Sequence, residues 1–274
     1  MSRKFSVVTT FNQAGYDKYG SRMIDTFLLN WPKEVHLYVY AEDCEVKQTA
    51  ANLTVYDFHD KVPSLVRFKE KYKNDLRANG KLATGPADKK GKQPGIGFRW
   101  DAIRFSHKVY AVCDIGQSTT DILLWMDADM ICHTPVPIEF LDKMFPEGFG
   151  IAFLGRKKKF TECGLYAMNC ANSGTMLFLQ WLKEAYDDAE NGIFTMEEWN
   201  DCWVFDRIRE RVQSTVRSWR QLDWNESSLQ GEGHPLINTE WGKYLDHLKG
   251  NRKDTGKSLA KDLVRPRSES YWVQ

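Results

Sequence analysis

The stretch Ile122-Leu123-Leu124-Trp125-Met126-Asp127-Ala128-Asp129 joins five apolar residues directly to a pair of carboxylates. A continuous apolar run of this length indicates a strand that is buried on both faces of a sheet. Residues two apart in an extended chain point the same way, so Asp127 and Asp129 can present both carboxylates to one spot. Open α/β sheets bind their ligands at the carboxyl ends of their strands. The motif therefore predicts a site for a divalent cation such as Mg²⁺ or Mn²⁺, both of which bind carboxylate oxygens.

Strand and helix patterns alternate along the rest of the chain. Strand composition occurs at residues 5–11, 35–40, 53–58, 150–154 and 165–169, and helical spacing occurs at residues 20–30, 99–112, 172–190 and 197–213. Residues 67–95 are Lys-rich, and we expect them to be partly helical before an irregular loop. The alternation predicts one Rossmann-like α/β domain over residues 1–274, with a central mixed, mostly parallel sheet flanked by helices and with residues 214–274 crossing back over the sheet.

Bulk composition excludes several classes of protein. The 274 residues contain 38 Lys and Arg against 37 Asp and Glu, so net charge gives no strong attraction to nucleic acid or membranes. No apolar run is long enough for a secretory signal or a spanning helix. The six cysteines have no Cys-x-x-Cys spacing, which argues against a zinc ribbon or a dense disulfide framework. We expect a soluble, cytoplasmic protein without membrane contact.

The apolar strand that ends in Asp127-Ala128-Asp129 resembles the nucleotide-sugar transferases of the A-type fold, in which an Asp-x-Asp motif organises metal and diphosphate. Within that group the chain is most similar to the glycogenin and lipopolysaccharide galactosyltransferase family. Residues 247–253, His-Leu-Lys-Gly-Asn-Arg-Lys, fit the family's His-x-x-Gly-x-x-Lys pattern, although Asp254 replaces the proline that commonly follows. The resemblance implies a glycosyltransferase that uses a nucleotide-sugar, with UDP as the expected carrier.

The resemblance also implies a set of site residues. The metal ligands would be Asp127, Asp129 and His247, and Mn²⁺ is expected before Mg²⁺ because imidazole suits it better. Gly250 would let the backbone approach the diphosphate, and Lys253 would contact the leaving phosphate. The remaining candidates for contacts to the nucleotide-sugar are Thr9, Thr10, Asn12 and Tyr16 in the first strand and loop, and Arg104 in the helix before the motif. Residues 1–130 would form the nucleotide-binding half, and residues 131–274 would form the acceptor half and close the metal site.

Two acidic residues are candidates for catalysis. Asp201 occupies the position of the family's acidic residue beneath the sugar, where it would stabilise charge at the anomeric carbon or act as a transient nucleophile in a retaining reaction. Glu162 replaces the asparagine of the family's Asn-x-Gly element beside the donor sugar, and its role as a base or an acceptor contact stays open. The resemblance favours a retaining reaction, whereas the donor sugar is not encoded in these motifs.

Two segments of the chain contain more basic than acidic residues, which is relevant to the kind of acceptor that the protein would bind. Residues 67–92 contain nine Lys or Arg against three acidic residues, and residues 243–267 contain eight against three. With the basic residues of segment 156–159, they can form a tract for an acidic glycan or for DNA that carries a hydroxymethylated base. Two other classes stay open: a nucleotidyltransferase or other phosphoryl-transfer enzyme, which would release pyrophosphate or phosphate, and a non-catalytic nucleic-acid-binding protein. The sequence indicates neither the oligomeric state nor the source organism.

Overall fold

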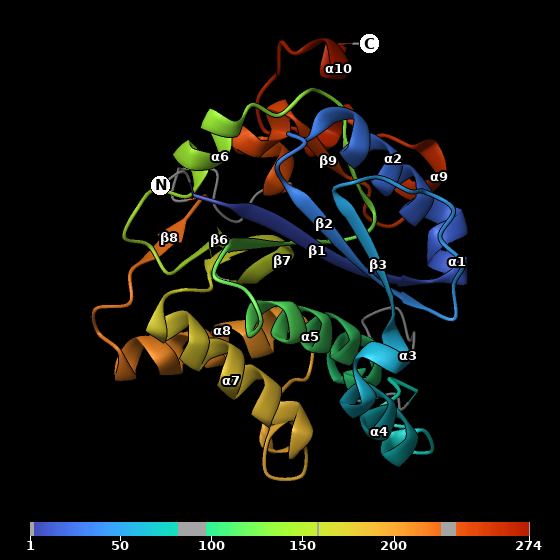
Figure 1. Cartoon of the computed structure of the whole chain (residues 1–274), viewed down its shortest axis with the longest axis vertical. Helices are drawn as coiled ribbons and strands as arrows, with labels where there is room; N and C mark the ends of the chain where they lie inside the picture. Colours follow the sequence, from blue (N-terminus) through green and yellow to red (C-terminus); the bar gives the residue numbers. More distant parts are fainter. Residues whose placement is uncertain (1–2, 82–96, 158, 226–233, 274) are drawn as a thin grey trace, which may run out of the picture.

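A seven-stranded mixed sheet runs through the centre of the molecule (Figure 1). The computed structural model describes residues 3–81, 97–157, 159–225 and 234–273. The strand order is β3-β2-β1-β4-β7-β6-β8, and β7 runs antiparallel to β4 and β6 while the other neighbours are parallel. The strands span β1 Phe5–Asn12, β2 His36–Glu42, β3 Leu53–Asp57, β4 Ile122–Met126, β6 Ile151–Arg156, β7 Lys159–Asn169 and β8 Gln221–Asp223. The expected α/β architecture with a mixed, mostly parallel sheet is confirmed.

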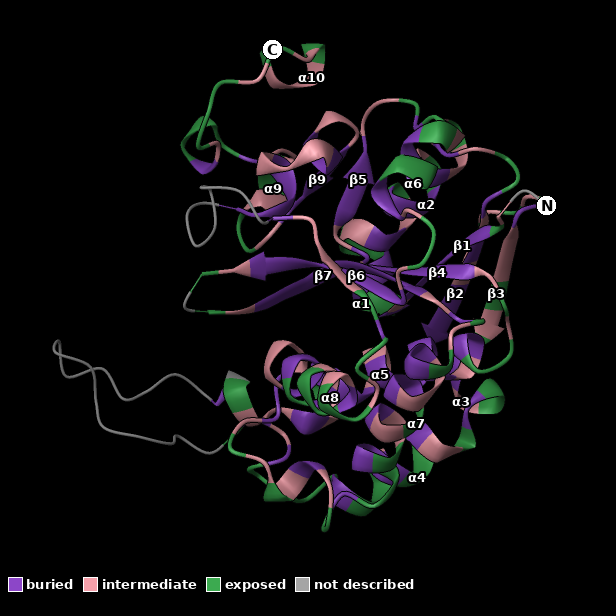
Figure 2. Cartoon of the chain, turned by 90° about the vertical axis from the view of Figure 1, so that its left-hand side faces the viewer, coloured by how far each residue is buried: buried purple, intermediate pink, exposed green. Residues whose placement is uncertain are grey.

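Helices cover both faces of the sheet (Figures 1 and 2). One face carries α4 (Pro63–Tyr72), α5 (Ala102–Gly116), α7 (Ser173–Asp187) and α8 (Asp201–Thr215), and the other carries α2 (Ser21–Asn30), α6 (Ile138–Met144) and the C-terminal segment. Each face has its own apolar core, because successive side chains of a strand point to opposite faces. In β4, Trp125 packs into the core beneath α5 and α7, while Leu124 packs into the core beneath α2. The shorter helices are α1 (Gln13–Gly15), α3 (Phe58–Lys61), α9 (Arg252–Thr255) and α10 (Ser270–Val273), and a π-helical turn at Tyr16–Gly20 joins α1 to α2.

Side-chain caps set where the helices near the carboxyl edge of the sheet begin. Asp101 accepts a hydrogen bond from the backbone N–H of Arg104 at the start of α5 (3.1 Å), and Asn200 accepts one from Trp203 at the start of α8 (3.0 Å). Such caps satisfy backbone donors that the first turn of a helix leaves without partners. The second cap makes Asp201 the first residue of α8.

The short elements that were not predicted include β5 (Met130–Cys132), β8, β9 (Leu245–His247) and α6. Strands β5 and β9 form a separate antiparallel pair in which Met130 lies opposite His247. Three residues are too few to show a period of two, so no sequence pattern indicates this pairing. The helical part expected within residues 67–95 is found in α4, and residues 82–96 lie outside the described residues. In the described part of the chain, no helix has the length and apolar character needed to cross a membrane.

Asp246 anchors the C-terminal segment beside β9. Its side chain is fully buried and accepts hydrogen bonds from the Ser258 backbone N–H (2.7 Å), the Ser258 hydroxyl and the Tyr271 hydroxyl (2.8 Å). A buried carboxylate needs such donors because burial removes its water. These contacts fold residues 258–271 back onto the strand that ends in His247.

We expect Asp246→Ala to lower the free energy of unfolding by about 3 kcal/mol, because it leaves the donors of Ser258 and Tyr271 without their acceptor. Denaturant-induced unfolding measures this difference. Asp254→Asn is the control: Asp254 is exposed and pairs with Lys18 at the surface, so its loss should cost less than about 1 kcal/mol. Equal stability of Asp246→Ala and wild type would show that the segment is held by other contacts.

Candidate active site

A cleft of about 630 Å³ opens at the carboxyl ends of β1, β2 and β4. This is the edge where open α/β sheets bind their ligands. Ten of the residues predicted from the sequence line it: Thr10, Asn12, Arg104, Asp127, Asp129, Glu162, Asp201, His247, Gly250 and Lys253. The cleft thus gathers side chains from both halves of the chain around one space.

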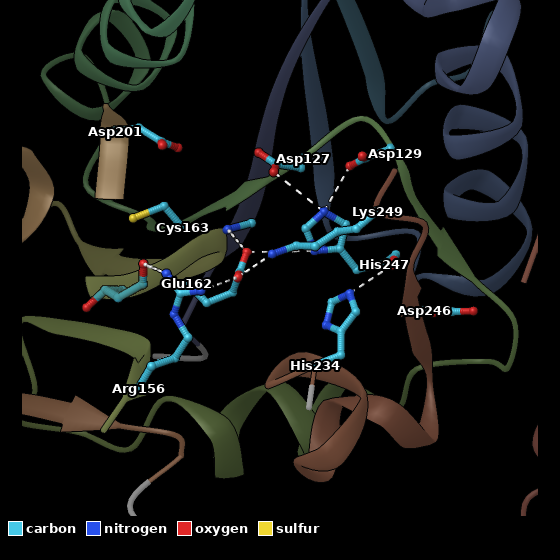
Figure 3. Close-up of polar contacts among 12 residues, drawn as sticks. Asp127, Asp129, Arg156, Glu162, Cys163, Asp201, His234, Asp246, His247 and Lys249 are labelled. Atoms are coloured by element: carbon cyan, nitrogen blue, oxygen red, sulfur yellow. Dashed lines mark hydrogen bonds and ion pairs between the residues drawn. The ribbon is translucent and has the colours of Figure 1, made fainter. Parts of the chain in front are cut away.

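Asp127, Asp129 and His247 converge on one wall of the cleft (Figure 3). Nε2 of His247 lies 3.0 Å from a carboxylate oxygen of Asp129 and 3.6 Å from one of Asp127. One potential ligand atom from each residue lies within 4.8 Å of the other two. Two carboxylates and an imidazole form a donor set that suits Mn²⁺ and, less well, Mg²⁺. The three side chains could hold one divalent cation.

Backbone packing holds the imidazole of His247 in place. Gly164 lies directly against the ring: a Cβ atom at residue 164 would be 2.4 Å from Cε1 and 2.7 Å from Nδ1 of His247. The carbonyl of Gly164 also accepts a hydrogen bond from the N–H of Asp127 (2.9 Å). On another side, Nε2 of the buried His234 donates to the carbonyl of His247 (2.9 Å). Any side chain at position 164 would push the imidazole away from its present position.

Two lysines offset the charge of the paired aspartates. Lys253 Nζ lies 2.8 Å from Asp129, and Lys108 Nζ lies 3.0 Å from Asp127. Burial alone would raise the pKa of Asp129, but His247 and Lys253 together hold it well below its usual value. At Asp127 burial outweighs the attraction of Lys108, so the pKa of that carboxyl is raised. The two carboxyl groups therefore differ in acidity although they are only two residues apart.

Lys108 links the aspartate pair to Asp201. Its ammonium group pairs with Asp201 as well as with Asp127, and it donates to the carbonyl of Cys163 (2.8 Å). Burial would lower the pKa of Lys108, but the two carboxylates raise it well above its usual value, so the group stays charged. Lys108 lies four residues after Arg104 in α5 and was not among the predicted site residues. Its role in joining two acidic sites depends on tertiary structure.

Glu162 is a buried carboxylate with two basic partners. Lys249 pairs with it closely, and Arg156 Nη1 lies 3.6 Å away (Figure 3). Burial would raise the pKa of Glu162, but Lys249 and His247 lower it to about 2. A carboxylate with so low a pKa is a weak proton acceptor at neutral pH. The two basic partners therefore hold Glu162 in its ionised form.

Thr9 and Tyr16, two of the predicted nucleotide contacts, do not line the cleft. The side chain of Thr9 is fully buried within the sheet, and only the last three residues of β1, Thr10 to Asn12, reach the cleft. The hydroxyl of Tyr16 donates to Gln48 (2.8 Å) and accepts from the N–H of Lys47 (3.1 Å), so it fastens a neighbouring loop.

Several cleft residues were not predicted from the sequence. They include Tyr19, Glu42, His107, Lys108 and Lys249. Glu42 could have been found from the sequence with a better prediction of where β2 ends. The strand extends two residues beyond the predicted end at Tyr40, and Glu42 is its last residue. With the correct strand end, the rule that ligands bind at carboxyl edges would have included it.

Comparisons with known proteins leave the family of the chain open. No family model matches it, and no curated protein matches its sequence. Among solved structures it is similar to mouse xyloside xylosyltransferase 1 in its apo form, with 11% identity over 91% of this chain and 99% of that one and a TM-score of 0.43. It is also similar to a glycosyltransferase involved in glycosylation of the major capsid of PBCV-1, with 10% identity over 92% and 99% of the two chains and a TM-score of 0.45.

A third solved structure is the apo form of the bifunctional glycosyltransferase WbbM, with 9% identity, 91% coverage of this chain and a TM-score of 0.44. This chain spans less than half of WbbM, 46% of its length. Likeness at this level assigns neither a family nor an activity.

We expect Gly164→Ala to weaken Mn²⁺ binding about 10- to 100-fold, because the added methyl group displaces the imidazole of His247. Isothermal titration calorimetry with Mn²⁺ and UDP measures the affinity, and circular dichroism and thermal unfolding confirm that the variant is folded. A folded Gly164→Ala protein with unchanged Mn²⁺ affinity would show that His247 is not a ligand.

Proposed function

We propose that this chain is a metal-dependent glycosyltransferase of the A-type fold, which moves a sugar from a nucleotide-sugar to a hydroxyl group of an acceptor. The observation that carries the proposal is the convergence of Asp127, Asp129 and His247 in a cleft at the carboxyl edge of the sheet. The cleft volume lies in the range of small-molecule sites, about 300–1,000 Å³. UDP is the expected carrier, and Mn²⁺ the expected ion with Mg²⁺ as the second choice.

The leaving diphosphate would lie between the aspartate pair and the loop after β9. A cation held by Asp127, Asp129 and His247 would act as a Lewis acid for the phosphate oxygens. Lys253, already 2.8 Å from Asp129, can turn its ammonium group toward the same oxygens. Gly250 has a positive φ of 58°, and a Cβ atom there would meet nothing within 4 Å. That open turn leaves room for the diphosphate beside the backbone.

The sugar would lie near Asp201 and Lys108. In a retaining transfer the acceptor hydroxyl enters on the face that the diphosphate leaves, and a carboxylate on the other face stabilises positive charge at the anomeric carbon. Asp201 would supply this carboxylate from the first turn of α8. Lys108 holds it by an ion pair, so it is oriented before the donor binds. Arg104 would support the nucleotide from the same helix, while Thr10 and Asn12 would contact it from β1.

The acceptor is proposed only as a hydroxyl-bearing molecule, either a glycan or a hydroxymethylated base in DNA. Many cations of residues 243–267 have partners within the protein, such as Arg252 with Asp262 and Arg267 with Glu269. Residues 82–92 of the other basic segment lie outside the described residues. The excess of basic residues in these two segments therefore does not require a polyanionic acceptor. Glu162, held by Lys249, would contact the acceptor hydroxyl.

The two halves of the chain would have different roles in the reaction. Residues 1–130 supply Thr10, Asn12, Arg104 and the aspartate pair to the cleft, and residues 131–274 supply Glu162, Asp201, His247 and Lys253. We propose that the first half binds the nucleotide and that the second half binds the acceptor and completes the metal site. Since His247 comes from the second half, neither half would bind the metal alone.

The protein incubated with Mn²⁺ and a panel of nucleotide-sugars should slowly hydrolyse one donor and release a nucleoside diphosphate. Chelation of the metal should stop the reaction, because the diphosphate would lose its Lewis acid. Product analysis by chromatography distinguishes this result from a nucleotidyltransferase, which would release pyrophosphate. Asp201→Asn should lower the turnover about 100-fold or more while nucleotide affinity changes less than about threefold.

Glu210→Gln is the matched control for this experiment. Glu210 lies on the same helix as Asp201 but is exposed and pairs with Arg207, so its substitution should leave turnover unchanged. Full activity of Asp201→Asn would remove Asp201 from the mechanism, and release of pyrophosphate would replace the proposed reaction class.

A further inference from the structure

Two cysteines line the cleft beside Asp201, and the proposed reaction uses neither of them. Cys163 lies in β7, and Cys202 is the second residue of α8. We propose that this pair is a site of reversible oxidation, at which a hydroperoxide converts the two thiols into a disulfide that joins β7 to the start of α8. The expected loss of sugar transfer rests on the proposed function, whereas formation of the disulfide does not.

The positions of the two sulfur atoms support a disulfide. The Sγ atoms of Cys163 and Cys202 and a carboxylate oxygen of Asp201 all lie within 4.8 Å of one another, and Figure 3 shows Cys163 and Asp201 in the cleft. Bonded sulfur atoms lie about 2.0 Å apart. The two side chains must therefore rotate towards each other, and the new bond would draw the first turn of α8 towards β7.

The two thiols differ in their access to solvent. Cys163 is only 2% exposed, whereas Cys202 is partly exposed. Burial, and after it the neighbouring thiol of Cys202, raises the pKa of Cys163 well above its usual value, so this sulfur stays protonated. A dissolved oxidant reacts first with the thiol that it can reach. We therefore expect Cys202 to be oxidised first and Cys163 to react with it afterwards.

The oxidation would take place in two steps, shown here for hydrogen peroxide. The thiolate of Cys202 attacks one peroxide oxygen, so that an S–O bond forms, the O–O bond breaks, and the departing hydroxide takes up the proton that Cys202 lost. Sγ of Cys163 then attacks Sγ of the resulting sulfenic acid: the S–S bond forms, the S–O bond breaks, and the hydroxide leaves as water with the proton of Cys163. The two thiols together lose two electrons, which reduce the peroxide to two molecules of water. A dithiol reverses the reaction by thiol–disulfide exchange.

The disulfide would disturb the carboxylate that the proposed transfer requires. Asp201 directly precedes Cys202 in α8, and its carboxylate pairs with Lys108. The ammonium group of Lys108 also donates to the carbonyl of Cys163 (2.8 Å). The new bond would thus pull on the chain at both contacts of Lys108. We expect the carboxylate of Asp201 to lose the orientation that the reaction needs.

A cation held by the same side chains is a weaker explanation. Cys163, Cys202 and Asp201 offer ligand atoms that are close enough together, and thiolates suit ions such as Zn²⁺. However, the ammonium group of Lys108 already pairs with the carboxylate of Asp201, so it would repel a second positive charge at this place. A disulfide is uncharged and needs no counter-ion when it is buried.

To test this site, the reduced protein is treated with hydrogen peroxide, its remaining thiols are blocked with N-ethylmaleimide, and its linked peptides are mapped by mass spectrometry. We expect a pair of peptides joined through Cys163 and Cys202 that separates after treatment with dithiothreitol. Hydrolysis of the nucleotide-sugar with Mn²⁺ should fall at least about tenfold on oxidation and return with dithiothreitol, because a small displacement of a reacting group has an effect of this size or larger.

Two variants and a control accompany the wild type. Cys202→Ser and Cys163→Ala should form no such link, and each should keep most of the turnover that the same variant has before oxidation. Cys202→Ser suffices if the buried substitution prevents folding, which circular dichroism detects. Cys44→Ser is the matched control and should behave as the wild type, because Cys44 is also partly exposed but does not line the cleft.

The inference is wrong if peroxide converts Cys202 to sulfinic acid, or links it to another cysteine, without joining it to Cys163. A linked protein that keeps its full turnover would show that the bond does not affect Asp201, and would overturn the expected inhibition. A protein that forms the link but hydrolyses no nucleotide-sugar in its reduced state would contradict the proposed function and leave the oxidation site in place. The two failures can therefore be told apart.

Discussion

The contact of His247 with Asp127 and Asp129 is the interaction on which the rest of the site depends. It joins residues 118 to 120 positions apart, and it exists because β9 pairs with β5 immediately after the aspartate motif. Gly164 admits the imidazole, and Asp246 ties the following segment to the strand. A change in any of these supports would move the imidazole of His247 away from the two carboxylates, and a metal site depends on the residues that orient its ligands.

Charge pairing inside the cleft follows one pattern. The acidic groups Asp127, Asp129, Asp201 and Glu162 are each paired with a lysine, and these lysines are Lys108, Lys249 and Lys253. Buried carboxylates are costly without such partners. The same ammonium groups lie within the space proposed for the donor, so they can serve anionic phosphate oxygens when a cation occupies the aspartates. The ion pairs thus stabilise the fold and keep positive charge at the site.

The sheet and its main helices could be predicted from the sequence because their patterns are long. The apolar run before Asp127 and the helical spacing of α2, α5, α7 and α8 all appear in the structure close to the predicted bounds. The short β5 and β9 strands carry no periodic signal, and the place of His247 came only from resemblance to a family motif. Thr9 does not line the cleft because it is buried before the last three residues of β1. Lys108 was not predicted because both of its carboxylate partners are distant in sequence.

The central claim is that one cation binds where the aspartate motif meets His247. Diffraction from crystals grown with Mn²⁺ and UDP, with data collected at a wavelength where manganese scatters anomalously, locates the ion directly. We expect one strong anomalous peak in contact with Asp127 or Asp129 and with Nε2 of His247, adjacent to the diphosphate. A peak elsewhere, such as beside Glu42 and His59, or bound UDP without any peak at His247, would contradict it.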